Sequence, residues 1–227
     1  MLRKTSVVAL ACFINSPCNA GFYLGAGAGP EGADFSQKAY VTRPGTFSVV
    51  DKNHFAGTGI FGSLFAGYGK AFNSIYLAAE ANANLSSVKY QLTNDEYLHS
   101  TFSKTTFTIK HSEGISLLPG YLISPNTLLY GRVGYVNGQV KVRDSDPTIR
   151  NFNKNRSGIR YGLGIRHSFY PNWSLMMEYS QIDYKSIEGR VFEPFGGVTK
   201  TTKITPHTAQ VGFGLIYHFD EPREYIK

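Results

Sequence analysis

The sequence is short of cysteine and has no long uninterrupted hydrophobic run. Only two of its 227 residues are cysteines, Cys12 and Cys18, and both precede residue 20. A chain that loses this segment keeps no cysteine, so disulfide bonds cannot form its framework after export. The longest charge-free stretch near the middle, residues 114–131, contains Pro119 and Pro125. Two prolines with neighbouring glycine and asparagine are rare in a membrane-spanning helix, so we expect none there.

Charged residues are also sparse, at 17% of the chain, and they are biased toward the positive sign. Lysine and arginine number 23 against 16 acidic residues, which gives a formal net charge of +7. Removing Arg3 and Lys4 with the first twenty residues would lower this charge from +7 to +5. The positive excess suits contact with an anionic surface. We expect no nucleic-acid partner, because an exported chain does not meet nucleic acid inside the cell.

The first twenty residues have the layout of a secretory signal peptide. Arg3 and Lys4 give a basic start, an apolar run covers residues 7–14, and residues 18–20 supply a small-residue cleavage site. The apolar run is too short for a membrane-spanning anchor, which needs about 20 residues. A lipoprotein site at Cys12 would leave too little hydrophobic sequence before the cysteine. We therefore predict that residues 1–20 are a signal peptide, removed by cleavage after Ala20.

Alternating side chains in residues 159–169, IRYGLGIRHSF, predict a β-strand with two different faces. One face carries bulky apolar residues such as Leu163 and Phe169, and the other carries Arg160, Arg166 and glycines. Successive side chains of a strand point to opposite faces of its sheet. A strand of a water-soluble protein would place small polar residues opposite its core face, rather than arginines set among glycines.

The same pattern recurs along the chain and predicts eight strands. Most of these strands combine a continuous apolar face with a face that is rich in glycine, small or charged residues. In residues 60–68 both faces are apolar, so the pattern does not say which of them is which. The eight strands are 22–29, 60–68, 75–84, 115–121, 129–135, 159–169, 173–180 and 209–219.

The connections between these strands alternate between short and long. The short ones contain turn-forming asparagine, and two of them also contain proline. They lie at residues 70–74, 124–127 and 170–172, whereas long polar connections cover roughly 30–54, 90–105, 141–157 and 185–204. Short turns at one end and long loops at the other are typical of an outer-membrane barrel. An even number of strands places both ends of the chain beside the short turns.

We therefore predict an all-β fold: an eight-stranded antiparallel up-and-down transmembrane β-barrel with short periplasmic turns and long extracellular loops. The apolar faces contact lipid, and the glycines and charged residues face a narrow lumen. Aromatic residues near the strand ends, including Tyr68, Tyr121 and Trp173, agree with the interfacial girdles of such barrels. A secreted ligand-binding barrel such as a lipocalin is the soluble alternative, and it would need a polar exterior.

The final strand contains Gly214, Tyr217 and Phe219, a glycine followed by two alternating aromatic residues. With this motif the chain resembles small eight-stranded outer-membrane barrels, and it is similar to the outer-membrane protein A transmembrane domain and the opacity-type surface proteins. The resemblance covers essentially all of residues 21–227 and implies that the barrel-assembly machinery reads this motif as an assembly signal. We assign residues 21–219 to the barrel and residues 220–227, which follow the last aromatic residue, to a short periplasmic tail.

Charged residues on the predicted lumen side are candidates for a structural ionic network. Opposite charges in a low-dielectric lumen should pair, because a lone buried charge is costly. Eight strands leave an interior that side chains only just fill, so a packed polar interior is the first interpretation and a gated conduction path is the alternative. The candidates are Glu80, Lys110, Arg132, Arg160, Arg166 and Glu178, and all but Lys110 and Arg160 fall at similar heights above the short turns.

Two of the long connections are basic. Residues 141–157 hold five Lys or Arg against two Asp, and residues 185–204 hold four against two Glu. Such loops form either an ordinary solvated surface or a contact surface for lipopolysaccharide phosphates or anionic host polymers. The candidate anionic-surface contacts are Lys141, Arg143, Arg150, Lys154, Arg156, Lys200 and Lys203.

Catalysis is the alternative from another class, since some barrels of this size are lipid A-modifying enzymes that carry His and Ser together. His167 and Ser168 are adjacent in sequence, so strand alternation sends them to opposite faces. His111 and Glu113 share the lipid-facing parity, so we expect them above the membrane or beside a β-bulge. No histidine spacing resembles a metal site. We predict no enzyme activity, no catalytic residue, no metal and no cofactor.

The predicted function is a non-enzymatic structural or surface-interaction role, adhesin-like or antigen-like, for a monomer in the outer membrane. A small-solute, porin-like pore is the first alternative. The predicted partners are outer-membrane lipid and lipopolysaccharide, the barrel-assembly machinery, and host or extracellular polymers. Loops carry the specificity of such barrels, so the sequence does not name the polymer.

Overall fold

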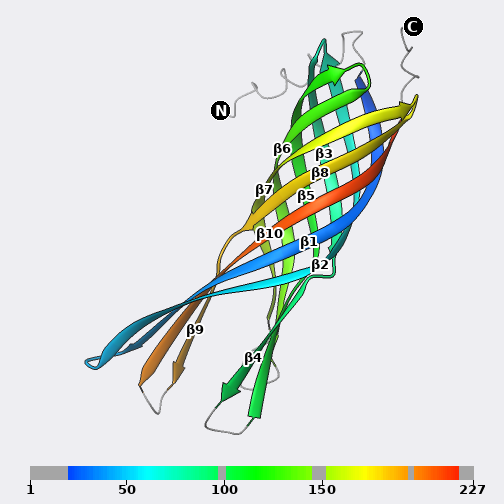
Figure 1. Cartoon of the computed structure of the whole chain (residues 1–227). Coiled ribbons are helices and arrows are strands. Elements are labelled where there is room, and N and C mark those ends of the chain that lie inside the picture. The colour runs from blue at the N-terminus through cyan, green and yellow to red at the C-terminus, as the bar shows by residue number, and fades with distance from the viewer. Residues whose placement is uncertain (1–19, 97–100, 145–151, 194–196, 220–227) are drawn as a thin grey trace, which may run out of the picture.

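A computed structural model describes residues 20–96, 101–144, 152–193 and 197–219 of the chain (Figure 1). These residues form ten β-strands, and none of their segments is a helix long and apolar enough to cross a membrane. The strands are β1 (Ala20–Arg43), β2 (Phe47–Phe72), β3 (Ile75–Ser86), β4 (Lys89–Glu96), β5 (Thr101–Ser124), β6 (Thr127–Asp144), β7 (Phe152–Tyr170), β8 (Trp173–Tyr184), β9 (Ile187–Glu193) and β10 (Val198–His218).

Eight of these strands close into a ring. Each neighbour in the order β1-β2-β3-β5-β6-β7-β8-β10 is hydrogen-bonded to the next, and β10 pairs with β1 to complete the circle. The pairings are antiparallel, and the strands run obliquely around the axis (Figure 1). Closure leaves no unpaired strand edge in the ring. The predicted eight-stranded antiparallel up-and-down barrel is therefore confirmed.

Tight turns join the strands at one end of the barrel, which we call the turn end. Two-residue turns connect β2 to β3 at 73–74, β5 to β6 at 125–126 and β7 to β8 at 171–172. Asn73 has a φ of 56°, a left-handed conformation that asparagine tolerates better than most residues. The paired residues Tyr23 and His218 place the start of β1 and the end of β10 at this same end.

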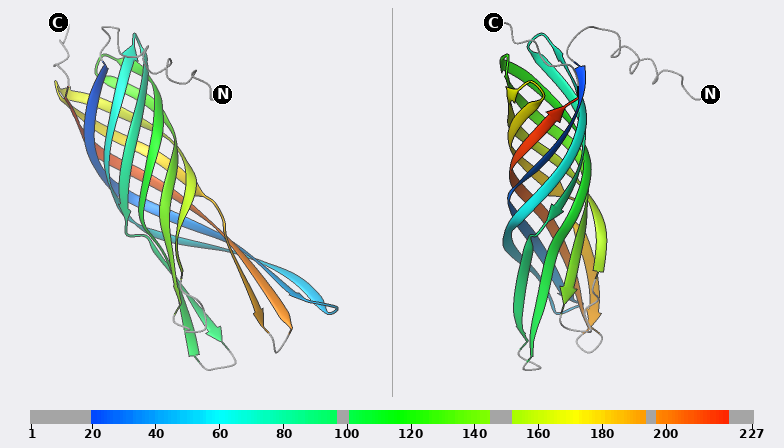
Figure 2. Two further views of the ribbon diagram at one scale, coloured as in Figure 1. Left: turned by 180° about the vertical axis from the view of Figure 1, so that it is seen from behind. Right: turned by 90° about the vertical axis from the view of Figure 1, so that its right-hand side faces the viewer.

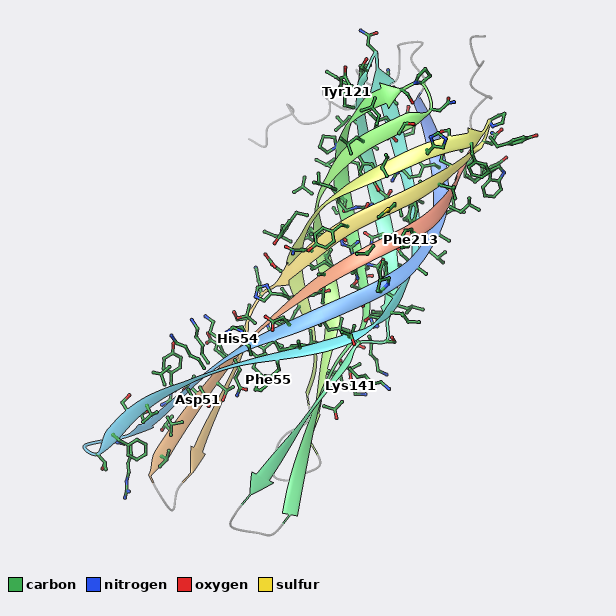
Figure 3. All side chains as sticks on the ribbon, viewed as in Figure 1. Asp51, His54, Phe55, Tyr121, Lys141 and Phe213 are labelled. Carbon is green, nitrogen blue, oxygen red and sulfur yellow. The ribbon has the colours of Figure 1, made fainter. Side chains whose placement is uncertain are left out.

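The barrel wall is apolar on its outside. Leu163 is 67% exposed on the outside, whereas Leu118 is fully buried in the lumen. The strand whose sequence was ambiguous is also resolved, because Phe61 is buried inside and Ile60 lies exposed outside. Side chains stand away from the wall around the ring, with Phe213 midway along it and Tyr121 near the turn end (Figure 3). Such an exterior is typical of a wall that contacts lipid and excludes the polar exterior of a lipocalin.

At the other end, the barrel wall splits in two places. β3 pairs with both β2 and β5, but its continuation β4 pairs only with β5, so the wall opens between β2 and β4. Ser87 covers the end of the β2–β3 pairing, since its Oγ accepts a hydrogen bond from the Ile60 amide at 2.9 Å. In the same way β8 pairs with β7 and β10, whereas β9 pairs only with β10.

The two splits divide the ring into two arms, which diverge in both the front and the back view (Figures 1 and 2). The first arm consists of the outer parts of β2, β1, β10 and β9, in that spatial order. The second arm consists of the outer parts of β4, β5, β6 and β7. We refer to this end of the molecule as the arm end.

A proline–glycine turn forms the tip of the first arm. The Thr46 amide donates a hydrogen bond to the Arg43 carbonyl at 3.1 Å, and Gly45 has a φ of 72°. Pro44 supplies the fixed φ of the second turn position, and the third position needs the positive φ that glycine allows. The sequence Arg43-Pro44-Gly45-Thr46 therefore forms a turn of type II character between two continuous strands.

The long connections predicted from the sequence are mostly strand. Residues 30–54, expected as a loop, pair from Pro30 with Ile60 to Arg43 with Phe47. Apart from residues 185–186 and 197, the described parts of 90–105, 141–157 and 185–204 likewise belong to β4, β5, β6, β7, β9 and β10. Polar composition suggested loops, but polar residues also suit strands that are exposed on both faces. The end of the barrel is therefore a pair of ordered sheets.

We expect a charge on the outer wall to prevent stable insertion. Leu163→Arg places a guanidinium at a position of high exposure on the apolar outside. If the site lies near the bilayer midplane, the substitution should lower the free energy of unfolding by about 2–4 kcal/mol. Urea unfolding in lipid vesicles measures this loss, with Leu163→Phe as the control of similar apolarity. Unchanged folding of the arginine variant would mean that the two faces of β7 are assigned the wrong way round.

Candidate functional site

The centre of the lumen is occupied by a carboxylate that two arginines share. Glu80 on β3 accepts a hydrogen bond from Arg132 at 2.6 Å and another from Arg166 at 2.7 Å. The Glu80 side chain is 1% exposed, and the two arginine side chains are 3% and 4% exposed. Tyr23 donates a third hydrogen bond to this carboxylate at 2.9 Å. Glu80 thus has a donor from β1, β6 and β7, on different parts of the wall.

A second carboxylate completes the layer. The Nε of Arg132 lies 2.9 Å from the Glu178 carboxylate on β8, and Tyr130 donates to the same group at 2.7 Å. Arg132 therefore bridges the two glutamates with different nitrogens of one guanidinium. Two arginines and two glutamates balance in formal charge, which is the arrangement that a buried low-dielectric interior tolerates. We call Glu80, Arg132, Arg166 and Glu178 the ionic layer.

Two tyrosine rings hold Arg166 in place. Its guanidinium lies 4.7 Å from the ring centre of Tyr23 and 4.8 Å from that of Tyr130. Cation–π contacts of this kind are strongest where water is excluded. Glycine is required beside each ring, because a Cβ added at Gly67 would overlap Tyr23 and one added at Gly164 would overlap Tyr130. The glycines of the lumen-facing pattern thus leave room for aromatic rings as well as for arginines.

Arg160 lies in the lumen but in a separate layer nearer the arm end. Its Nη2 donates to the Gln210 side chain at 3.2 Å, and Gln210 donates in turn to Glu31 at 2.8 Å. Glu31 also accepts a hydrogen bond from Ser86. The Gln210 amide therefore connects Arg160 to Glu31 without direct contact between the two charged groups. Glu31 and Gln210 escaped the sequence analysis, although Glu31 continues the inward parity of Tyr23.

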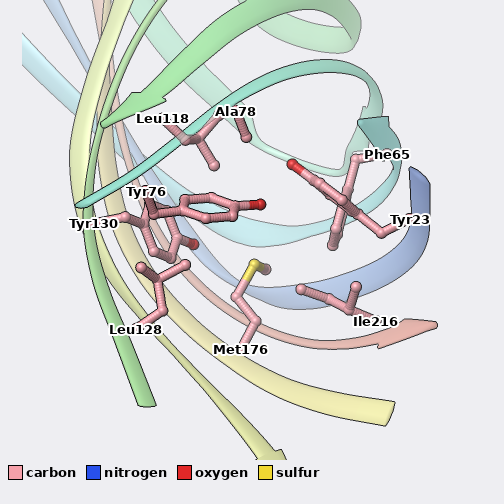
Figure 4. Close-up of a cluster of buried hydrophobic side chains, with 9 residues drawn as sticks. All are labelled: Tyr23, Phe65, Tyr76, Ala78, Leu118, Leu128, Tyr130, Met176 and Ile216. Atoms are coloured by element: carbon pink, nitrogen blue, oxygen red, sulfur yellow. The ribbon is translucent and has the colours of Figure 1, made fainter. Parts of the chain in front are cut away.

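Apolar side chains fill the lumen on both sides of these polar layers. Toward the turn end, rings and aliphatic chains from opposite walls meet near the axis (Figure 4). Toward the arm end, Phe35, Ile109 and Tyr184 belong to a second buried cluster. The first cluster contains Tyr23, Phe65, Tyr76, Ala78, Leu118, Leu128, Tyr130, Met176 and Ile216.

The described part of the lumen contains small cavities, two of which lie on opposite sides of the ionic layer. One of about 30 Å³ lies on the arm side of the ionic layer and is lined by polar groups that include Asn82, Asn84 and Arg160. The other, of about 20 Å³, lies near the turn end beside Arg166 and His218. The two cavities share no lining residue, and each has room for about one or two water molecules. The described lumen is therefore a packed interior with separate polar pockets.

Lys110 does not belong to the lumen, which corrects the sequence prediction. Ile109 and Ser112 are both buried, and Lys110 and His111 between them are exposed. The β5–β6 register shifts between Ile109 and Ser112, so a β-bulge adds one residue and reverses the alternation. Glu113 and His111 therefore both lie on the outside and beside a β-bulge, which is one of the two locations expected for them from the sequence. A strict alternation carried along β5 gave Lys110 the wrong face.

The basic loop candidates do not form one surface. Arg156 lies on β7 opposite Gly138, half-buried with its Nε enclosed, so its prediction as an exposed loop contact is wrong. Lys141 is half-buried on β6, and Lys203 on β10 lies 3.4 Å from Glu188. The backbones of Arg143, Lys154 and Lys200 lie in β6, β7 and β10, but their side chains and the whole of Arg150 lie outside the described part.

A polar cluster on the outer wall was not predicted. His207 lies 2.8 Å from Asp183, which also accepts a hydrogen bond from Tyr161 at 3.3 Å. His167 and Ser168 do lie on opposite faces, since His167 is exposed and bonded to Thr127 while Ser168 bonds to Ser174 in the lumen. Among the described residues no group of three or more His, Cys, Asp or Glu could hold a metal ion.

The predicted assembly signal, Gly214, Tyr217 and Phe219, lies where the last strand of the barrel, β10, pairs with the first, β1. The ring centres of Trp173 and Tyr217 are 5.0 Å apart, and those of Tyr217 and Phe219 are 5.1 Å apart, both edge to face. The Phe219 amide donates to the Phe22 carbonyl at 3.0 Å, and a Cβ at Gly214 would approach the Ala26 carbonyl at 2.9 Å. The motif thus joins the last strand to the first, and its recognition by the assembly machinery stays a prediction.

The sequence model of the outer membrane protein beta-barrel domain family matches residues 6–219. The chain belongs to this family. The family, the closed ring and the apolar outside together place the barrel in the outer membrane, and they confirm the resemblance seen in the sequence. No curated protein matches the chain in sequence.

Solved structures of other outer-membrane proteins are similar to this barrel. OprG from Pseudomonas aeruginosa is similar over 87% of this chain and 96% of its own, with 13% identity and a TM-score of 0.52. Neisserial surface protein A is similar over 88% and 98%, with 13% identity and a TM-score of 0.45. Ail of Yersinia pestis is similar over 80% and 98%, with 15% identity and a TM-score of 0.34. The similarity to OprG supports the fold and says nothing about ligands.

Removing Arg132 should destabilise the barrel. Arg132→Ala leaves Glu178 in the lumen with Tyr130 as its remaining side-chain donor, and it halves the positive charge around Glu80. Removing one partner of a buried ion pair lowers the free energy of unfolding by about 3–5 kcal/mol. The urea midpoint in detergent micelles, followed by Trp173 fluorescence, should fall accordingly. Lys110→Ala, which removes an exposed cation, is the control. Equal midpoints for the two variants would contradict a buried role for Arg132.

Proposed function

We propose that the chain is a non-enzymatic surface-interaction protein of the outer membrane. In this proposal the turn end faces the periplasm, the two arms project outside the cell and the lumen stays closed. The arms are the part that meets other molecules. The barrel anchors them and sets their spacing.

The observation that carries the proposal is the contrast between the lumen and the arms. The lumen is filled by the ionic layer and by apolar clusters on both sides of it. The arms instead extend the strands beyond the barrel wall, and the exposed residues of the first arm include Lys38 and Lys52 as well as Val49 and Val50. Ordered sheets that bury little of their own surface are suited to binding a partner. Exposed extensions on a rigid scaffold commonly carry function.

A small-solute pore is the second candidate, and the polar cavities favour it. Asn82 and Arg160 have buried polar atoms without a hydrogen-bond partner in the described lumen, close to the ionic layer. If Arg132 and Arg166 moved to other partners, the cavities on the two sides could join. The ionic layer would then act as a gate rather than as a permanent plug.

Planar-bilayer conductance separates the plug from the pore. We expect the wild-type protein to give only small and infrequent currents, because the ionic layer and the aromatic rings fill the cross-section. Glu80→Gln should raise the frequency of opening, since it removes the charge that holds Arg132 and Arg166 together. Lys110→Gln changes one charge outside the lumen and should leave the currents unchanged. Steady large currents from the wild-type protein would favour the pore instead.

Surface interaction itself is tested by shortening the arms one at a time. Replacing residues 38–52 with Asn-Gly joins Gln37 to Asn53, which already face each other, and removes the tip of the first arm. Replacing residues 93–104 with Asn-Gly joins Leu92 to Thr105 on the second arm. Cells that display each variant are compared on arrays of extracellular-matrix and lipopolysaccharide samples. Loss of wild-type binding with either arm supports the proposal, and no binding by wild-type cells contradicts it.

A further inference from the structure

The outward face of the first arm carries a row of three lysines. Lys52 on β2 lies directly opposite Lys38 on β1, and Lys38 lies directly opposite Lys203 on β10. Residues directly opposite each other in an antiparallel pair point to the same face. Glu188 on β9 ends the row, 3.4 Å from Lys203. Three cations on adjacent strands therefore share this row with one anion.

This row is unfavourable for the free protein. Like charges directly opposite each other destabilise a sheet. Lys38 and Lys52 are exposed, and neither has an acidic partner within ion-pair distance in the described part of the chain. Only the Lys203 charge is offset, by Glu188. An external anion would relieve the repulsion between Lys38 and its two neighbours, so the row is suited to an anionic ligand.

An open groove adjoins the lysine row at the tip of the same arm. Its volume is about 510 Å³, which is within the usual range of about 300–1,000 Å³ for small-molecule sites. Thr201 and Arg190 lie two residues from Lys203 and Glu188, so the groove begins about 7 Å from the row. The lining contains no acidic residue and consists of Thr42, Arg43, Pro44, Gly45, Thr46, Phe47, Ser48, Arg190, Thr199 and Thr201.

The lining has the chemistry of a sugar site with an anionic substituent. Arg190 lies opposite Thr201 and so shares the outward face with the lysine row. Its planar guanidinium group matches sulfate, phosphate and carboxylate oxygens in a bidentate geometry. Threonine and serine hydroxyls can donate to and accept from sugar hydroxyls. Tyr40, 42% exposed and directly opposite Thr201 on the same face, offers an aromatic ring to the C–H face of a sugar. An inorganic anion would use the cations alone and leave the ring and most hydroxyls without a contact.

We propose that the tip groove and the lysine row form one binding site for an anionic glycan, a saccharide that carries sulfate, phosphate or carboxylate groups. Arg190 holds an anionic group in the groove, the hydroxyls and Tyr40 hold the sugar, and the lysines contact further anionic groups along the chain. This inference rests on the proposed function, because it requires the first arm to lie outside the cell. The glycan comes either from lipopolysaccharide of the cell itself or from a polymer outside it.

The test measures binding of purified full-length protein in detergent micelles to dextran sulfate by surface plasmon resonance. Uncharged dextran and inorganic polyphosphate supply the sugar and the anion separately. We expect dextran sulfate to bind more tightly than either and binding to weaken with added salt, which screens exposed charges. The groove pair Lys38→Gln and Arg190→Gln, which removes one charge from the row and one from the groove, should raise the Kd at least about tenfold, a difference of about 1.4 kcal/mol. Lys38→Gln should raise it by a smaller factor.

The matched control is the pair Lys89→Gln and Lys110→Gln on β4 and β5. It removes the same charge from exposed positions of the second arm, away from the groove. Equal weakening by the groove pair and the control pair would show that net charge alone attracts the polymer, and it would overturn the proposal. Polyphosphate binding as tight as dextran sulfate would also overturn it, because the sugar would then contribute nothing. Retention of a folded band on unheated gel electrophoresis verifies that each variant is a barrel.

Two further measurements separate the sources and the two levels of inference. In the first measurement, lipopolysaccharide micelles replace dextran sulfate, before and after enzymatic dephosphorylation. Binding that is lost with the phosphates assigns the glycan to the cell's own membrane. Absence of phosphate-dependent binding assigns it to an external polymer. Cells that lose array binding when the first arm is shortened, but whose purified protein ignores dextran sulfate and lipopolysaccharide, would retain the proposed function and refute the glycan site. Absence of any arm-dependent binding would refute both.

Discussion

The rest of the barrel depends on the pairing of the buried Glu80 with two buried arginines, Arg132 and Arg166. Each charge needs its partners because removing one leaves another buried without compensation. Arg132 reaches both Glu80 and Glu178, so three strands must keep their register for the contacts to form. A one-residue slip would turn a charge toward lipid. The ionic layer therefore fixes strand register as well as filling the lumen.

The ring is closed at the turn end and open at the arm end. β4 pairs with β5 but not with β2, and β9 pairs with β10 but not with β8. A closed barrel has no edges, whereas two separate arms have four. The split begins at Ser87 on one side and after Tyr184 on the other, where short irregular segments interrupt strands that are otherwise continuous. The protein thus combines a wall suited to lipid with sheets suited to water, and the two differ in side chains more than in backbone.

Strand alternation predicted the ring, the outside and the ionic layer from sequence, because a period of two survives as long as no residue is inserted. It failed at Lys110, where a bulge of one residue reverses the faces and leaves no signal in the side chains themselves. Glu31 and Lys38 were missed for a different reason. Their polar surroundings suggested a loop, although the alternation of β1 continues through both residues. The Pro44-Gly45 turn was a visible signal that residues 30–54 form a hairpin.

Edge protection offers another reason for lysines on the first arm, since charged residues on edge strands prevent pairing with other chains. Edge protection accounts for Lys52, because the outer part of β2 is an edge where β4 does not pair with it. It also accounts for Arg190 on β9, which is the opposite edge of the first arm. It does not account for Lys38 on β1, a strand with a neighbour on each side along its whole outer part. A central lysine that lies opposite lysines on both neighbouring strands lowers the stability of the sheet without protecting an edge. Its position is explained by an anion that contacts all three strands.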